Sequence, residues 1–160
     1  MLTVQVPNSY HLTQCGLSYI HLLDGYRLDA AKGKSTVHIV GMDALYKTLA
    51  EHVLCKPEQL NGEELMFLLK RINGSEADFC ELLKIQTVQL NNWKKRSHHA
   101  LMPLVTEVTA RMLLGEMLGC WRLVSDILEG LHDSMKKPYL APDILFLRRS
   151  DDGWEVARGS

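Results

Sequence analysis

The chain has 160 residues, of which 46% are hydrophobic and 23% charged, and its formal net charge is −1. This composition is close to that of an average globular protein, and it excludes disordered, fibrous and disulfide-dense chains. No stretch approaches the roughly eighteen uncharged apolar residues of a membrane helix, and the N-terminus lacks the basic and apolar segments of a secretory signal, so we expect a cytoplasmic protein without a membrane partner.

Apolar and β-branched runs near the N-terminus predict a small sheet. Three of them occupy residues 17–23, 26–29 and 36–40. The first two flank Asp24-Gly25, a dipeptide that tolerates the positive φ angles of a hairpin turn. Residues 43–54 then change to the spacing of an amphipathic helix. We therefore expect residues 1–56 to form a small α/β domain in which one helix covers three strands.

A proline separates this region from the rest of the chain. Lys56-Pro57-Glu58 interrupts the helical spacing, because proline has no amide hydrogen and restricts the residue before it. We interpret this segment as a linker that leads to a second domain over residues 57–135. Residues 136–160 follow as a C-terminal hairpin or tail, since Ser150-Asp151-Asp152-Gly153 separates two strand-like runs. The sequence leaves open whether this hairpin joins the first sheet.

The second domain has helical signals throughout. Asn61 and Glu64 have the spacing of a capping box, and Ser75 is placed to cap a second helix. A tight turn at Lys84-Ile85-Gln86 leads into a third helix. Two further apolar helices are expected at residues 104–113 and 123–131. The predicted fold class is mostly α with small β elements.

The second and third of these helices have the pattern of a helix-turn-helix. The third one places Thr, Gln and Asn outward and ends on Lys94-Lys95-Arg96. Amide and hydroxyl groups match the edges of bases in a major groove, and cations bind phosphates. Residues 82–106 carry four basic and no acidic side chains, whereas residues 1–81 and 107–160 carry net charges of −3 and −2. The pattern predicts binding to double-stranded DNA through a recognition helix at about residues 87–95.

The run from Ser75 to Trp93 resembles the helix-turn-helix of Cro and phage repressors, the XRE family. The resemblance implies a five-helix, lambda-repressor-like domain and places base-reading residues on the third helix, with Gln86 as its N-cap near a phosphate. Pattern and resemblance together give the candidate DNA-binding residues Gln86, Thr87, Val88, Gln89, Asn91, Asn92, Lys94, Lys95 and Arg96.

Three positions depart from the motif of that family. Glu76 stands in place of a glutamine that contacts phosphate, Lys84 in place of the glycine of the turn, and Lys94-Lys95-Arg96 in place of a glutamate and a glycine. We expect DNA to repel the Glu76 carboxylate and the added cations to offset this loss. A lysine in a left-handed turn costs about 1 kcal/mol relative to glycine.

The region upstream, Tyr10 to Leu17 followed by Asp24-Gly25-Tyr26, is similar to regulators of the YgiT/MqsA antitoxin type. In these proteins a small β-rich N-terminal domain precedes the same helix-turn-helix. Such antitoxins hold zinc with paired C-x-x-C motifs, whereas this chain has only Cys15-Gly16 in the corresponding place. The resemblance therefore implies a degenerate N-terminal domain without zinc, whose sheet is held by packing.

Neither metal binding nor catalysis finds support in the sequence. No cysteine pair or Cys/His spacing indicates a zinc site or a disulfide framework, so we expect reduced thiols at Cys15, Cys55, Cys80 and Cys120. The motifs of a nucleophilic serine and of a phosphate-binding loop are absent. We expect a protein that is not an enzyme and has no cofactor, no bound metal and no catalytic residues.

The last two predicted helices carry more apolar residues than one buried face needs, which favours burial against a second copy of the chain. The expected dimer interface consists of Met112, Leu113, Met117, Leu118, Trp121, Val124 and Leu128. The sequence thus predicts a homodimeric, sequence-specific transcriptional repressor. The alternative is an antitoxin whose N-terminal domain binds a toxin or another protein while the helix-turn-helix regulates the operon. A toxin-like reading frame beside the gene would favour this alternative.

Overall fold

The computed structural model describes residues 8–31, 33–72, 74–95, 102–120, 126 and 142–157. The chain divides into two compact units. The sheet unit consists of Met1–Thr48 and Pro142–Ser160, and the helical unit of Leu49–Ala141. The division falls inside helix α1 (Met42–Cys55), before the boundary that was expected after residue 56. In the described chain helices hold more residues than strands do, which agrees with a mostly α fold with small β elements.

The C-terminal hairpin belongs to the same sheet as the N-terminal strands. Among the described residues this sheet has the order β1-β2-β5-β6, built from β1 (Tyr10–His11), β2 (Ile20–Leu22), β5 (Leu145–Ser150) and β6 (Gly153–Ala157). Strands β2 and β5 run parallel, with Ile20 opposite Leu145, and the other pairs are antiparallel. The predicted C-terminal hairpin is therefore present, and it joins the first sheet.

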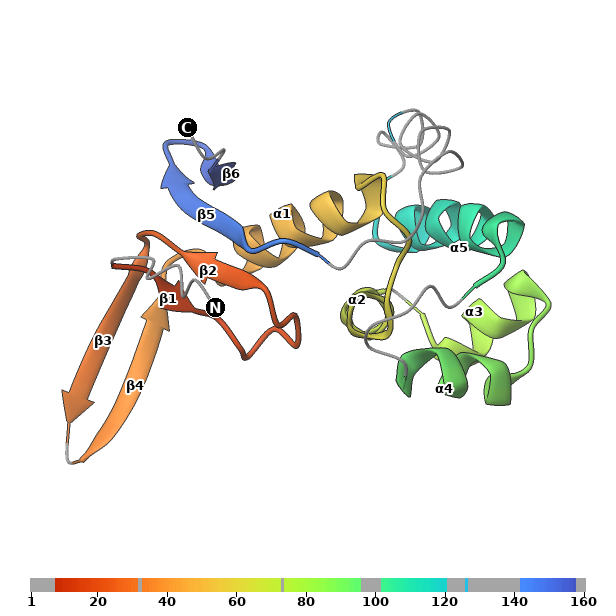
Figure 1. Ribbon diagram of the computed structural model, residues 1–160, viewed down its shortest axis with the longest axis horizontal. Helices are drawn as coiled ribbons and strands as arrows, with labels where there is room; N and C mark the ends of the chain where they lie inside the picture. Colours follow the sequence, from red (N-terminus) through yellow and green to blue (C-terminus); the bar gives the residue numbers. More distant parts are fainter. Residues whose placement is uncertain are drawn as a thin grey trace, which may run out of the picture. The chain divides into compact units, whose positions relative to one another are not determined.

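The expected three-stranded sheet with a turn at Asp24-Gly25 is wrong. Strands β3 (Tyr26–Ala31) and β4 (Lys34–Ile39) pair only with each other among the described strands, as a hairpin that extends away from β1 and β2 in Figure 1. Asp24 and Gly25 lead from one sheet to the other. Gly25 has the expected positive φ of 74°, but a Cβ there would lie 2.4 Å from Arg149 and 2.5 Å from Trp154. The C-terminal hairpin thus packs against the dipeptide and takes the edge of β2.

A tryptophan of the C-terminal hairpin ties the sheet unit together. The Trp154 indole nitrogen donates a hydrogen bond to the Val40 carbonyl at 2.9 Å, and the Thr48 hydroxyl donates to the Trp154 carbonyl at 3.3 Å. The buried apolar residues of this unit include Leu12, Leu17, Ile20, Leu22 and Leu147. These contacts join residues from the two ends of the chain in one core.

The helical unit contains the second half of α1 and four further described helices, α2 (Gly62–Leu69), α3 (Glu76–Leu83), α4 (Thr87–Lys95) and α5 (Leu104–Met117). The predicted caps are confirmed. Asn61 and Glu64 form a complete capping box on α2, and Ser75 forms another on α3 with Asp78. Each box satisfies two backbone N–H groups that a helix start leaves without a partner. The helix expected at residues 123–131 falls almost wholly outside the described residues.

Lys84 ends α3 in the left-handed conformation, with φ 57° and ψ 41°, as the turn between α3 and α4 requires. Replacing Lys84 with glycine is expected to raise the free energy of unfolding by about 1 kcal/mol, because glycine adopts this conformation without steric cost. Lys70 is the matched control, since it ends α2 with a right-handed φ of −70°. Urea unfolding should show stabilisation by Lys84→Gly and none by Lys70→Gly. Equal effects would contradict this account of the turn.

Candidate nucleic-acid interface

Helix α4 exposes most of the predicted DNA-binding residues. Its buried residue is Leu90. A period of 3.6 residues places Val88, Asn92 and Lys95 on the side of the helix opposite Leu90. The exposed members of the predicted set are Gln86, Thr87, Val88, Gln89, Asn91, Asn92 and Lys95. Lys94 is half-buried, and Arg96 lies outside the described residues.

Two glutamines, Gln86 before α4 and Gln89 within it, form hydrogen bonds in the first turn of this helix. The Gln86 carbonyl accepts the first helical hydrogen bond from the Leu90 N–H at 3.2 Å, which is the role of an N-cap backbone. The Gln89 side-chain oxygen accepts the Gln86 N–H at 3.0 Å. An amide that reads adenine in two places needs both its oxygen and its nitrogen. Gln89 already uses the oxygen, so Asn92 is the better placed amide for this contact.

Lys94 forms an ion pair with Glu76, which corrects the expectation that it is available to a phosphate. Its ammonium donates to both carboxylate oxygens of Glu76, at 2.9 and 3.0 Å. Lys94 lies near Leu90 on the helical period, on the side that faces α3, and this explains why it reaches the start of that helix. Lys95, one residue further, is exposed.

Cys80 lies on α3 near the same ion pair. Burial, and then the Glu76 carboxylate, raise the pKa of the Cys80 thiol, while a hydrogen bond from the Thr87 side chain and the charge of Lys94 oppose this shift. Thr87 is therefore turned toward α3 at its hydroxyl, although part of its surface is exposed. Among the predicted base readers, this leaves Val88, Asn91 and Asn92 without such a tie in the described residues.

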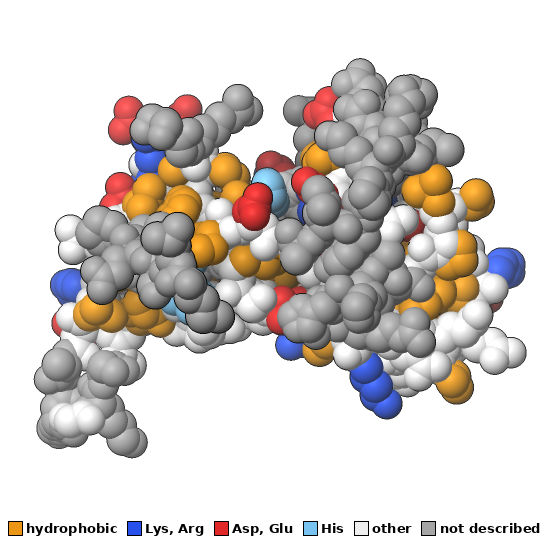
Figure 2. All heavy atoms as spheres, in the orientation of Figure 1, with side chains coloured by type: hydrophobic (Ala, Val, Ile, Leu, Met, Phe, Trp, Pro, Cys, Tyr) orange, Lys and Arg blue, Asp and Glu red, His pale blue; other side chains and the backbone are white. Residues whose placement is uncertain are grey.

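On the face of the molecule in Figure 2, the described Lys and Arg side chains, which are coloured blue, form no continuous patch, and some of them lie beside Asp and Glu side chains, which are coloured red. A continuous patch attracts a phosphate backbone more strongly than single charges do.

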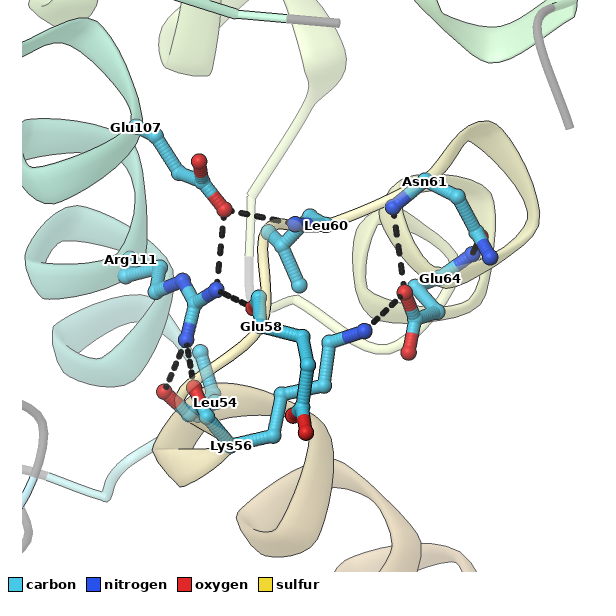
Figure 3. A network of polar contacts seen from close by, with 8 residues as sticks. All are labelled: Leu54, Lys56, Glu58, Leu60, Asn61, Glu64, Glu107 and Arg111. Carbon is cyan, nitrogen blue, oxygen red and sulfur yellow. Dashed lines mark hydrogen bonds and ion pairs between the residues drawn. The ribbon is translucent and has the colours of Figure 1, made fainter. Parts of the chain in front are cut away.

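A buried polar network that sequence reasoning missed supports these helices (Figure 3). Arg111 of α5 is fully buried, and its guanidinium donates to the Leu54 carbonyl at 3.2 Å, to the Lys56 carbonyl at 2.6 Å and also to the Glu58 carbonyl. It also donates to the Glu107 carboxylate at 2.8 Å. The same carboxylate oxygen accepts the Leu60 N–H at 2.6 Å. Arg111 thus binds one carbonyl of the last turn of α1 and two carbonyls of the segment that follows it.

This network corrects the interpretation of Lys56-Pro57-Glu58 as a linker between domains. Proline does end α1, but the chain that follows is held on both sides. The Lys56 ammonium donates to Glu64 at 2.6 Å, and both side chains are almost wholly buried. The segment therefore packs against the helical unit, with Lys56 buried and Pro57 and Glu58 half-buried. A signal for it existed in the sequence, since Glu107 and Arg111 form an i,i+4 pair on a mostly apolar helix.

The network also sets which face of α5 is buried. The buried residues are Glu107, Ala110, Arg111, Leu114 and Gly115. Val105, which the apolar pattern included, is instead 79% exposed. Of the expected dimer interface, Met112 is exposed and Leu113, Met117 and Leu118 are half-buried, while Trp121, Val124 and Leu128 lie outside the described residues.

His52 gives the helical unit a pH dependence. Burial, and then the charge of Lys56, lower the pKa of His52 below its usual 6.5, and Glu64 and Glu58 oppose this. Below about pH 6.5 the unfolded chain therefore binds a proton that the folded chain does not, so the free energy of unfolding falls as the pH falls.

We expect His52→Gln to reduce this loss of stability between about pH 7 and 5.5, measured by urea unfolding. An unchanged pH dependence in His52→Gln would contradict the assignment. His21 contributes with the same sign in the sheet unit, since burial and the neighbouring His11 lower its pKa.

The described residues contain neither a metal site nor a membrane-spanning helix. There, no three His, Cys, Asp or Glu side chains come together in a way that could hold a metal ion. None of the described helices has the length and apolar character needed to cross a bilayer. Comparison of the chain with protein-family models, curated proteins and solved structures found no match. The residues of α4 and their surroundings are therefore the features of the described chain that bear on its function.

Proposed function

We propose that the protein is a sequence-specific DNA-binding regulator that inserts α4 into a major groove. The observation that carries this proposal is the outward face of α4, where exposed amide side chains and Lys95 stand without any acidic residue. A protein surface with no ligand to read usually mixes acidic and basic groups. The left-handed turn at Lys84 and the short α3 before it are the arrangement expected of a helix-turn-helix, and the XRE resemblance supports the same reading.

The proposed regulator acts as a homodimer. One short helix contacts few base pairs, so such proteins double their contacts by two-fold symmetry. The half-sites would then be separated by about one turn of DNA, roughly ten base pairs. Met112 of α5, a member of the expected dimer interface, is exposed, which is compatible with such an interface. Repression would follow where such a site overlaps a promoter.

Selection of duplexes from a random pool tests the proposal. We expect enrichment of a two-fold symmetric motif with half-sites about ten base pairs apart. In titrations of the selected duplex at several salt concentrations, Lys95→Ala should lower the slope of log K against log salt by about 0.9, because one phosphate contact is lost. Lys47→Ala, at an exposed lysine of α1, should leave the slope unchanged. Absence of enrichment, together with absence of duplex binding at low salt, would overturn the proposed function.

A further inference from the structure

The ion pair between Glu76 and Lys94 connects the first residue of α3 with the end of α4. Both oxygens of the Glu76 carboxylate contact the Lys94 ammonium, at 2.9 and 3.0 Å. The Lys94 side chain is 22% exposed and the Glu76 side chain 42% exposed. The Glu76 side chain is therefore the more accessible of the two.

This arrangement removes one of the cations that α4 could present to a phosphate. Lys94 and Lys95 are the basic residues of α4, and only Lys95 lacks a carboxylate partner in the part of the chain that the structure describes. A carboxylate accepts hydrogen bonds and donates none, so it cannot bind a phosphate oxygen. A phosphate that approaches Lys94 meets a negative group at contact distance, and the two repel each other.

A purely structural role does not account for the pair well. Partly exposed ion pairs contribute little to stability, because water already solvates both groups. Helices α3 and α4 each also bury an apolar side chain, since Phe79 and Leu90 are fully inaccessible. The main consequence of the pair is therefore electrostatic, at the surface that α4 offers to a ligand.

We propose that Glu76 shields Lys94 from DNA phosphates and thereby holds down sequence-independent binding, so that base contacts on α4 determine a larger share of the affinity. This inference rests on the proposed function. The cation that would bind any duplex equally is paired with a carboxylate of the same chain, while Asn92 remains exposed to read bases. Sequence-independent affinity comes from phosphate contacts, and removing one contact lowers it without affecting base readout.

Glu76→Gln in the full chain tests the inference on a duplex of arbitrary sequence. The variant keeps the side-chain length and leaves the capping box of Ser75 and Asp78 intact. Freeing Lys94 should steepen the slope of log K against log salt by about 0.9 and tighten binding about fivefold to tenfold at about 0.1 M salt. Lys94→Ala alone should not steepen the slope, because it removes the cation and leaves the repelling carboxylate. In the double variant Glu76→Gln/Lys94→Ala, the steeper slope should disappear.

Glu81→Gln controls for the loss of one negative charge. Glu81 is an exposed carboxylate on the same helix, and no cation pairs with it among the described residues. The inference is overturned when the wild type binds duplex and Glu76→Gln changes the slope no more than Glu81→Gln does. It is also overturned when the double variant keeps the steeper slope. Failure of every variant and of the wild type to bind duplex overturns the proposed function itself, and the inference with it.

Discussion

Replacing Arg111 with methionine is expected to lower the free energy of unfolding of the helical unit by about 3–5 kcal/mol. Methionine fills a similar volume but leaves the buried Glu107 carboxylate without its cation. It also leaves the carbonyls of Leu54, Lys56 and Glu58 without the guanidinium that binds them. Because these groups lie where α1 ends and the path to α2 begins, the loss should affect the whole helical unit. Urea unfolding followed by helical circular dichroism measures it.

Two further variants separate geometry from charge. Arg111→Lys keeps a buried cation but cannot reach several carbonyls and a carboxylate from one planar group, so it should lose most of the same stability. Arg148→Met removes an arginine that pairs with Glu155 at the surface, where both side chains are about half exposed. It should cost less than about 1 kcal/mol. A similarly small effect of Arg111→Met would show that the network is not a determinant of stability.

Local signals predicted the starts of the helices well. The capping boxes of α2 and α3 each depend on two residues three positions apart, and such spacing is visible in the sequence. The left-handed conformation of Lys84 was expected from the resemblance to the XRE motif, which has a glycine at this position of the turn, and Lys84 adopts it with φ 57°. In each case the physical cause lies within one helical turn of the residue concerned.

Strand pairing could not be predicted in the same way. Asp24-Gly25 correctly indicated a positive φ, but the dipeptide does not record which strand lies beside β2. That strand comes from the other end of the chain, and the Asp24 carboxylate accepts the N–H of Arg149, 125 residues later. The local hairpin signal lost to this long-range pairing because β5 offers a parallel edge and Trp154 fills the space beside Gly25.

In the candidate site, too, local features could be predicted from the sequence and long-range contacts could not. Helical periodicity around Leu90 predicts that Asn91, Asn92 and Lys95 are exposed, and all three are exposed in the structure. The ion pair of Lys94 was not predicted, because its partner Glu76 is 18 residues away on another helix. Sequence reasoning had placed a repelled carboxylate and several free cations there, whereas the structure joins the carboxylate to one of those cations.

Asn92→Ala is expected to weaken binding to the selected DNA site by about 1–3 kcal/mol, or roughly 5-fold to 150-fold, while binding to a duplex of arbitrary sequence stays nearly unchanged. Asn92 lies opposite Leu90 on the outward face of α4, and its amide can bind an adenine edge with both oxygen and nitrogen. The measurement is a pair of titrations, one with each duplex, at a fixed salt concentration.

Gln89→Ala provides the contrast, because the side-chain amide of Gln89 already accepts a hydrogen bond within the protein and that of Asn92 does not, among the described residues. The Gln89 oxygen holds the Gln86 N–H, so its removal should destabilise the start of α4 by about 1 kcal/mol and affect both duplexes through the fold. Asn92→Ala should leave the free energy of unfolding unchanged and affect one duplex. Equal losses on both duplexes for Asn92→Ala would mean that this side chain positions the protein on the DNA backbone, and base readout would then have to come from Val88 or Asn91.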